Sequence, residues 1–258
     1  MAVTADHPAP RGAGARDSPV GLDAETLARA LTYPYDRPGG SFLYDAARHR
    51  VTPLATRDVA GWASGRQAVL AVGSNAAPEQ LRRKFGSFAG ERRIPALAAT
   101  VRDHDVVFAA RVSAYGAVPA TLAPCPGAIA SVTVLLLAPD QVVRMGETES
   151  LGRAYDLVPV DAALLAHEGR PHDTSGLPPA VACYAARCGP LRVAGAPVAL
   201  AAVRVTARIW PEMTEHDLLG RLARRAGLAV EAFAHRLVTD VPFRRRVAGG
   251  LAGGLPAL

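Results

Sequence analysis

The hydrophobic positions of the chain form short apolar runs in its first two thirds and a helical periodicity near its end. Runs rich in Val, Leu and Ala between Gly or Pro residues predict strands, because such side chains fit a pleated, buried surface. The run at 128–138 is the strongest of these, and the run at 67–72 leads directly into a turn. Strands or extended segments are predicted at 67–72, 98–102, 106–112, 119–122, 128–138, 155–160, 180–187 and 198–208.

Turn-like residues separate these strands, and start signals or periodicity predict the helices. Residues 103–105 and 124–127 are expected to turn the chain, and 33–40 is expected to be a turn-rich connection. Asp140 is predicted to cap the helix that runs to Glu149. Helices are predicted at 24–31, 78–85, 140–149, near 162–166, and at 214–226 and 229–237, with Leu218, Leu219, Leu222 and Phe233 facing inward.

Strands mixed with a few helices predict an α+β fold with a closed or partly closed sheet. We expect a disordered tail at 1–20, an α+β domain at 21–208 and a helical extension at 209–258. No apolar run approaches the roughly 18 to 20 residues of a spanning helix, and the N-terminal residues contain no apolar segment typical of a secretory signal. The sequence therefore predicts a cytoplasmic protein that binds no membrane.

Composition and charge change this picture little. Half of the 258 residues are hydrophobic, which excludes disorder of the whole chain. Lys84 is the only lysine among 29 basic residues, so the net charge of +6 comes from arginine, a bias more typical of genome composition than of a phosphate-binding surface. The basic clusters at 82–84, 92–93, 221–225 and 244–246 are short and have few aromatic neighbours. We interpret them as solvated helix faces and keep nucleic-acid binding as a weaker alternative.

The cysteines and histidines indicate neither a disulfide scaffold nor a metal site. Cys125, Cys183 and Cys188 are odd in number and form no C-x-x-C pair, so small buried apolar residues are the favoured interpretation. The seven histidines are dispersed and no ligand set accompanies them. No metal and no cofactor are predicted.

The segment 71–81, A-V-G-S-N-A-A-P-E-Q-L, is the most informative stretch of the chain. A strand ends there, Gly73 permits a close turn, and Pro78 opens a helix. Such a turn presents backbone N–H groups to an anion, although Ser74 or Asn75 acting only as a helix cap is the simpler alternative. No G-K-[ST] follows, and Ser74 does not lie in a G-x-S-x-G motif, so nucleotide binding and serine catalysis are not favoured.

Read with the segments downstream, this loop resembles the Y-G-S-N-L loop of the γ-glutamylcyclotransferase family. The order and spacing of the segments carry the resemblance, which spans residues 67–160. The matching segments are 105–110 as the strand after the loop, 119–127 as the family's A-T-I-x-P-x-x-G stretch, 128–137 as the next barrel strand, and 145–149 with 155–160 as its L-D-x-x-E-G…Y-x-x-x-x-V segment.

The resemblance implies a mixed or antiparallel β-barrel with flanking helices, and it assigns roles to six residues. Glu149 takes the place of the family's catalytic acid/base, and the substrate-binding loop corresponds to Val72, Gly73, Ser74, Asn75 and Ala76. The chain departs from the family at Val72, where tyrosine is usual, at Ala76, where leucine is usual, and at Ser150, where glycine is usual. Glu147 and then Glu168 are the rival acids.

The implied reaction is cyclisation of a γ-glutamyl amine or amide to 5-oxoproline with release of the amine, catalysed as a transferase or lyase without a cofactor. The substrate's own α-amine is the nucleophile, so the protein must fold the substrate and move one proton. A single sheltered glutamate with a raised pKa suits that task. The alternative function is a non-catalytic module on the same fold that binds a small ligand or a partner. The leaving amine and the oligomeric state are not predicted.

Overall fold

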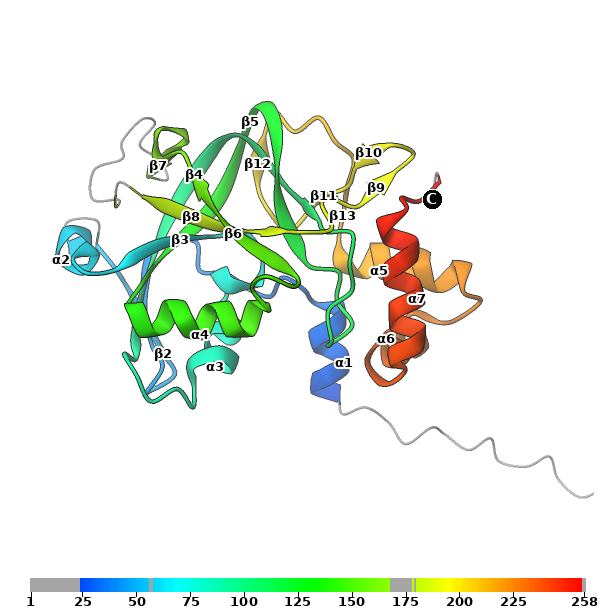
Figure 1. Cartoon of the computed structure of the whole chain (residues 1–258), viewed down its shortest axis with the longest axis horizontal. Coiled ribbons are helices and arrows are strands. Elements are labelled where there is room, and N and C mark those ends of the chain that lie inside the picture. The colour runs from blue at the N-terminus through cyan, green and yellow to red at the C-terminus, as the bar shows by residue number, and fades with distance from the viewer. Residues whose placement is uncertain (1–23, 56–57, 168–177, 179, 257–258) are drawn as a thin grey trace, which may run out of the picture.

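The computed structural model describes residues 24–55, 58–167, 178 and 180–256, and a large mixed sheet dominates it (Figure 1). Within these residues eleven strands form one sheet and seven α-helices flank it, so the predicted α+β class is confirmed. The sheet strands are β1 (Phe42–Asp45), β2 (Arg50–Pro53), β3 (Gln67–Ala71), β4 (Arg93–Phe108), β5 (Ala120–Leu137), β6 (Tyr155–Val160), β7 (Leu165–His167), β8 (Val181–Ala186), β11 (Ala199–Leu200), β12 (Val205–Thr206) and β13 (Glu212–Met213).

The sheet is open. Its main path runs β13-β11-β4-β5-β3-β8-β6, and the end strands β13 and β6 do not pair with each other in the described chain. The predicted barrel is therefore wrong. Strand β3 lies in the interior of this path, antiparallel to β5 and parallel to β8. The turn that follows β3 thus leaves from an interior strand, two strands away from the end strand β6.

Strands β4 and β5 are longer than the sequence predicts, because two expected turns are bends within continuous strands. Asp103 has φ 57° and Gly127 has φ 82°, and the Gly127 N–H donates to Asp103 Oδ1 at 2.8 Å. The ladder continues on both sides, with residues 125–128 bulging out opposite Asp103 alone. Turn residues accordingly produce a β-bulge here instead of reversing the chain.

Other predicted strands have the wrong bounds at positions where the neighbouring strand in the sheet changes. Residues 198–208 form two short strands, β11 paired with β4 and β12 paired with β5, instead of one. Residues 162–166 form a 3-10 turn, Ala162–Leu164, that leads into β7. The β1–β2 hairpin and the two-stranded ribbon of β9 (Arg192–Val193) and β10 (Ala196–Pro197) are additions that the sequence analysis lacks.

Five predicted helices are confirmed, and their bounds agree with the sequence signals. They are α1 (Ala24–Leu31), α3 (Pro78–Phe85), α4 (Pro139–Glu149), α5 (Glu215–Arg225) and α6 (Val230–Thr239). Two helices were not predicted, α2 (Val59–Ala63) and α7 (Val241–Ala252). Helix α7 begins after Asp240, whose side chain accepts the Phe243 N–H at 2.8 Å, with Pro242 in the first turn. That Asp-x-Pro signal was available in the sequence.

The C-terminal helices pack on the sheet as part of its core. Figure 1 shows α5, α6 and α7 gathered beside α1 at one end of the molecule, whereas α3 and α4 lie together elsewhere along the sheet. The four side chains predicted to face inward from α5 and α6 are all buried. They belong to the same apolar cluster as Leu97 of β4 and Val134 of β5.

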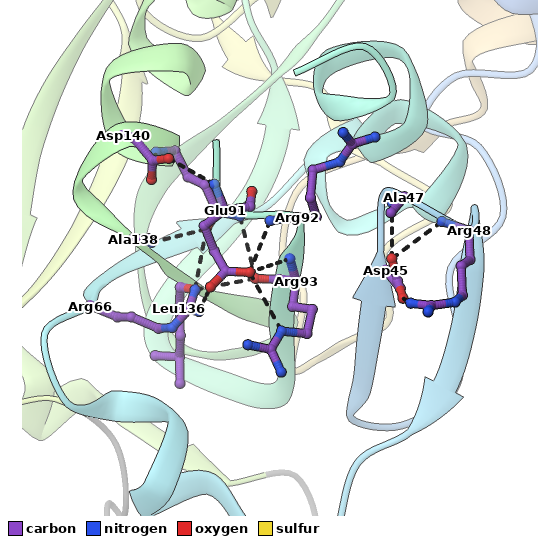
Figure 2. A network of polar contacts seen from close by, with 11 residues as sticks. Asp45, Ala47, Arg48, Arg66, Glu91, Arg92, Arg93, Leu136, Ala138 and Asp140 are labelled. Carbon is purple, nitrogen blue, oxygen red and sulfur yellow. Dashed lines mark hydrogen bonds and ion pairs between the residues drawn. The ribbon is translucent and has the colours of Figure 1, made fainter. Parts of the chain in front are cut away.

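A polar network fixes where α4 begins (Figure 2). The prediction that Asp140 caps this helix is wrong, because Ala138 is the N-cap and Asp140 lies in the first turn. Asp140 Oδ2 instead accepts the Glu91 N–H at 2.8 Å, and Gln141 Nε2 donates to the Glu91 carbonyl at 2.8 Å. The Glu91 carboxylate accepts the N–H groups of Arg92 and Arg93, each at 2.9 Å, and pairs with Arg66 at 3.2 Å. The helix that ends in Glu149 is thereby anchored at its first turn.

Two further sequence expectations concern the described part of the chain as a whole. No helix there has the length and apolar character needed to cross a membrane. All three cysteines are free, as expected, with Cys125 and Cys183 buried. Cys188 is exposed, so its prediction as a buried residue is wrong, because it lies just beyond the end of β8.

Candidate functional site

A cavity of about 340 Å³ opens where the turn after β3 meets the end of α4. Gly73, Asn75 and Glu149 all line it, so the predicted acid and most of the predicted loop share one cavity. The remaining walls come from α1, α3, the connection between β4 and β5, and strands β6 and β8. Segments from six parts of the chain therefore converge on Glu149.

Glu149 is the last residue of α4 and lies against the loop. Asn75 Nδ2 donates to Glu149 Oε1 at 2.8 Å, which joins the end of α4 directly to the turn after β3. Ser150, the residue that follows, has φ 56° and ψ 49° and caps the helix in the left-handed conformation. Glycine adopts that conformation most easily, which explains physically why a glycine at this position suits such a site. Ser150 achieves the same turn and also lines the cavity.

Lys84 is a site residue that the sequence analysis missed. It was interpreted as part of a solvated helix face, but its side chain is only 5% exposed, and its Nζ forms an ion pair with Glu149 Oε1. Nζ also lies 3.3 Å from Met145 Sδ, one turn earlier on α4. The signal that pointed to it was its rarity, as the single lysine beside 28 arginines. A compact ammonium group fits this enclosed position, whereas a planar guanidinium is wider.

The Lys84 contact reverses the expected pKa of the glutamate. Burial acts to raise the pKa of Glu149, but the charge and hydrogen bond of Lys84, aided by Asn75 and Arg111, lower that pKa below its usual value. Burial in turn lowers the pKa of Lys84, and Glu149 opposes that shift. The expectation of a raised glutamate pKa is thus wrong, and the carboxylate is ionised at neutral pH.

The turn after β3 owes its shape to close approach rather than to an unusual φ. A Cβ on Gly73 would meet the Tyr33 hydroxyl oxygen at 2.1 Å, and that oxygen accepts the Ala120 N–H at 2.7 Å. Residues Ser74–Ala76 form a 3-10 turn, closed by the N–H of Ala76 donating to Gly73 and that of Ala77 donating to Ser74. The N–H groups of Ser74 and Asn75 are the donors that the turn itself does not use.

The other predicted loop residues divide between cavity and core. Val72 and Ser74 line the cavity, although both side chains are largely buried. Ala76 does not line it, because its methyl group packs into the apolar cluster that includes Leu81 and Phe85 of α3. Within the loop, the residues that contact the cavity are therefore 72–75.

Four of the six tyrosines of the chain line the same cavity. Burial raises the pKa of each hydroxyl, to about 12 for Tyr184 and further for the others, so all four hydroxyls stay protonated and neutral. They supply hydrogen-bond donors without charge. These tyrosines are Tyr33, Tyr115, Tyr155 and Tyr184.

Unpaired polar atoms concentrate at this cavity. In the described chain eight buried side-chain polar atoms have no hydrogen-bond partner, and five of them belong to residues that line it. Buried polar groups are almost always paired in folded proteins, so such a concentration indicates a place for a polar ligand. Two are acceptors, Asn75 Oδ1 and Gln80 Oε1, and the hydroxyl of Tyr184 and the nitrogens Arg29 Nε and Arg83 Nη1 can donate.

Positive charge surrounds Glu149. Arg29 lies over the Tyr115 ring at 4.1 Å, and Arg111 lies over the Tyr155 ring at 5.1 Å. Arg83 forms ion pairs with Glu25 and Glu79 through Nη2, which leaves its Nη1 free. The cavity can therefore hold a carboxylate or another anion beside a single ionised glutamate.

The rival glutamates do not reach this site in the described structure. Glu147 is 61% exposed, pairs with Arg144 at 3.4 Å and does not line the cavity. Glu168 lies outside the described residues. Among the residues that are described, no group of three or more His, Cys, Asp or Glu is arranged to hold a metal ion.

Comparison with family models, with curated proteins and with solved structures gives no match for this chain. The geometry of the cavity is therefore the basis for any functional conclusion.

Proposed function

We propose that the protein is a γ-glutamylcyclotransferase-like enzyme that converts a γ-glutamyl amine or amide to 5-oxoproline and releases the amine. The observation that carries this proposal is the meeting of Glu149 with the 72–75 loop in one enclosed cavity, joined by the Asn75–Glu149 hydrogen bond of 2.8 Å. The reaction needs a base and hydrogen-bond donors for the oxyanion. The buried carboxylate of Glu149 and the backbone N–H groups of the loop supply these two kinds of group.

The unpaired atoms of the cavity match the head of a γ-glutamyl group. Glu149 is ionised and only accepts, so the amide nitrogen of Asn75 faces it and Asn75 Oδ1 is free to accept from the substrate ammonium, as is Gln80 Oε1. Arg83 Nη1 and Arg29 Nε can donate to the α-carboxylate. Acceptors for an ammonium and donors for a carboxylate are thus both present.

The chemistry then requires two protons to move from the α-nitrogen to the leaving nitrogen. Glu149 accepts a proton from the α-ammonium, and the freed amine attacks the γ-carbonyl carbon to form the ring C–N bond. The N–H groups of Ser74 and Asn75, which the 3-10 turn does not use, would stabilise the oxyanion that forms. The carbonyl re-forms and the bond to the leaving nitrogen breaks as Glu149 passes its proton to that nitrogen. The ring nitrogen then loses its extra proton through Glu149 to the released amine, so the products are 5-oxoproline and an ammonium ion. Holding the substrate folded contributes the most, because intramolecular attack reaches effective molarities of about 10⁵ M or more.

One observation favours the alternative function, a non-catalytic module that binds a small ligand. The ion pair between Lys84 and Glu149 already satisfies the carboxylate, and a binding site needs no free base. For catalysis, the substrate ammonium must compete with Lys84 for Glu149. The two functions differ in turnover, so they can be separated by experiment.

The test is formation of 5-oxoproline from a panel of γ-glutamyl amino acids and γ-glutamyl alkylamines. Wild-type protein is expected to be active on at least one of them, and Glu149→Gln to lose about 100-fold or more, the usual contribution of an acid/base group. Glu147→Gln is the matched control on the same helix and should retain activity, because Glu147 is exposed. Ligand-induced stabilisation without turnover in both wild type and Glu149→Gln would favour the binding module.

Two finer expectations remain part of this proposal. We place the enzyme in the cytoplasm and expect a small-molecule substrate without nucleic acid. Nucleic-acid binding through the arginine clusters would contradict the second expectation. Such binding would appear as strongly salt-dependent retention of DNA or RNA.

A further inference from the structure

A second cavity of about 580 Å³ adjoins the first and shares Arg111 and Ser150 with it. Three more arginines line it, Arg153 from the turn between α4 and β6, Arg187 just after β8, and Arg245 from α7. No acidic side chain is among the described residues that line it. Four separate parts of the chain therefore bring guanidinium groups to one hollow beside Glu149.

The positive charge of this second cavity is largely uncompensated. Arg187 pairs with Asp156 at 2.9 Å. Arg153 and Arg245 form no ion pair in the described part of the chain. Arg111 serves the first cavity, where its charge helps to lower the pKa of Glu149. Without Arg111, three guanidinium groups face one carboxylate, an excess of two positive charges.

The turn that carries Arg153 is held in place by the residue that follows α4. The N–H groups of Arg153 and Ala154 donate to the Ser150 carbonyl at 3.0 and 2.9 Å. Ser150 itself lines both cavities, so the two cavities adjoin one residue from Glu149. A substrate whose γ-glutamyl head occupies the first cavity would extend its leaving group toward the second.

We propose that the second cavity binds the leaving amine and selects amines that carry two negative charges, as a phosphate monoester or as two carboxylates. This inference rests on the proposed function and adds the class of leaving group to it. Guanidinium groups bind both anions through paired hydrogen bonds, and an excess of two positive charges matches a dianion. The neutral part of the amine serves only to join the two anchored ends of the substrate.

The test compares three γ-glutamyl substrates with the same reacting bond: γ-glutamyl-phosphoethanolamine, γ-glutamyl-aspartate and the neutral γ-glutamyl-ethylamide. We expect kcat/KM for at least one dianionic substrate to exceed that for the ethylamide by about tenfold or more. The double variant Arg153→Gln/Arg245→Gln should lose that advantage, measured as the ratio of kcat/KM for the dianionic substrate to kcat/KM for the ethylamide. Arg246→Gln is the control, because Arg246 follows Arg245 on α7 but does not line the cavity. Comparing the phosphate substrate with the dicarboxylate substrate shows which of the two anions the second cavity prefers.

A second readout keeps this inference separate from the proposed function. Cys188 is the exposed thiol and lines the second cavity, while the other two cysteines are buried. Free phosphoethanolamine or aspartate should slow alkylation of Cys188 by iodoacetamide in the wild type but not in the double variant. Protection without turnover of any amide would support the anion site and contradict the enzyme. Equal kcat/KM for all three substrates, with no protection, would overturn the anion site and leave the enzyme in place.

Discussion

Lys84 and Glu149 meet at the centre of the candidate site, and each determines the charge of the other. Their side chains are 5% and 15% exposed, so solvent screens them little. Removing one partner of such a pair leaves the other buried and uncompensated, which is more costly than losing an exposed pair. The effect of this pair on Glu149 can be tested through pH.

Lys84→Met should shift the acid limb of the pH–activity profile to higher pH. In the wild type Lys84 lowers the pKa of Glu149. The carboxylate therefore stays ionised even below its usual pKa, and it is protonated only when the pH falls through the lowered value. In the variant burial acts without Lys84, so that pKa rises and the base is already protonated at a higher pH. The measurement is 5-oxoproline formation across a pH series. An unchanged profile would show that Lys84 does not control the glutamate.

A buried ion pair between Asp105 and Arg208 lies beside the bend of β4 and β5 and joins several elements. Asp105 of β4 is fully buried, and Arg208, which follows β12, contacts both of its carboxylate oxygens at 3.0 Å. Arg208 also donates to the Val203 carbonyl at 3.0 Å and pairs with Glu212. One guanidinium group therefore ties the bent strand to the segment that connects β11, β12 and β13.

Asp105→Ala should reduce the free energy of unfolding by about 3 kcal/mol, the lower end of the range for a broken buried ion pair, because Glu212 still pairs with Arg208. Urea denaturation measures the change. Asp156→Ala is the matched control, since both members of its pair with Arg187 are half exposed and such pairs contribute about 1 kcal/mol or less. Equal losses in the two variants would contradict a structural role for the Asp105 pair.

The sequence predicted elements better than their connections. Helix α3 was predictable to the residue, because Pro78 marks its start and Phe85 is its last buried apolar position. The continuity of β4 was not, because Asp103 and Gly127 favour a reversal as much as a bulge, and only pairing between distant residues decides between them. The same limit applies to the site: Glu149 and the loop were predictable as residues, whereas the Lys84 contact and the unpaired atoms depend on packing.

The C-terminal helices are joined to the rest of the molecule by a buried acid. Glu215, the first residue of α5, is 1% exposed and accepts the Val118 N–H at 2.7 Å, from the connection between β4 and β5. Its second oxygen has no partner. Burial raises the pKa of Glu215 well above its usual value, and the Val118 hydrogen bond only partly offsets this. Burial therefore favours the protonated form of Glu215 in the folded protein.

Glu215→Gln should make the whole molecule more stable at pH 8 than the wild type, with little difference near pH 4. The pKa of Glu215 is higher when folded than when unfolded, so its contribution is complete below the unfolded pKa of about 4.3 and decreases as pH rises toward the folded value. Glutamine keeps the hydrogen bond and cannot ionise. Thermal unfolding at the two pH values checks this. A variant less stable than wild type at both would indicate that the carboxyl group itself is needed.

Because helix α4 is fastened at both ends, it works as a spacer of fixed length. Gln141 is bound to the Glu91 carbonyl at one end, and Glu149 is bound to Asn75 at the other, eight residues or about 12 Å further along the axis. One inserted or deleted residue between these anchors would rotate everything beyond it by about 100°. The Glu149 carboxylate would then point away from the loop, so we expect only substitutions that keep the number of residues in this stretch to preserve the site.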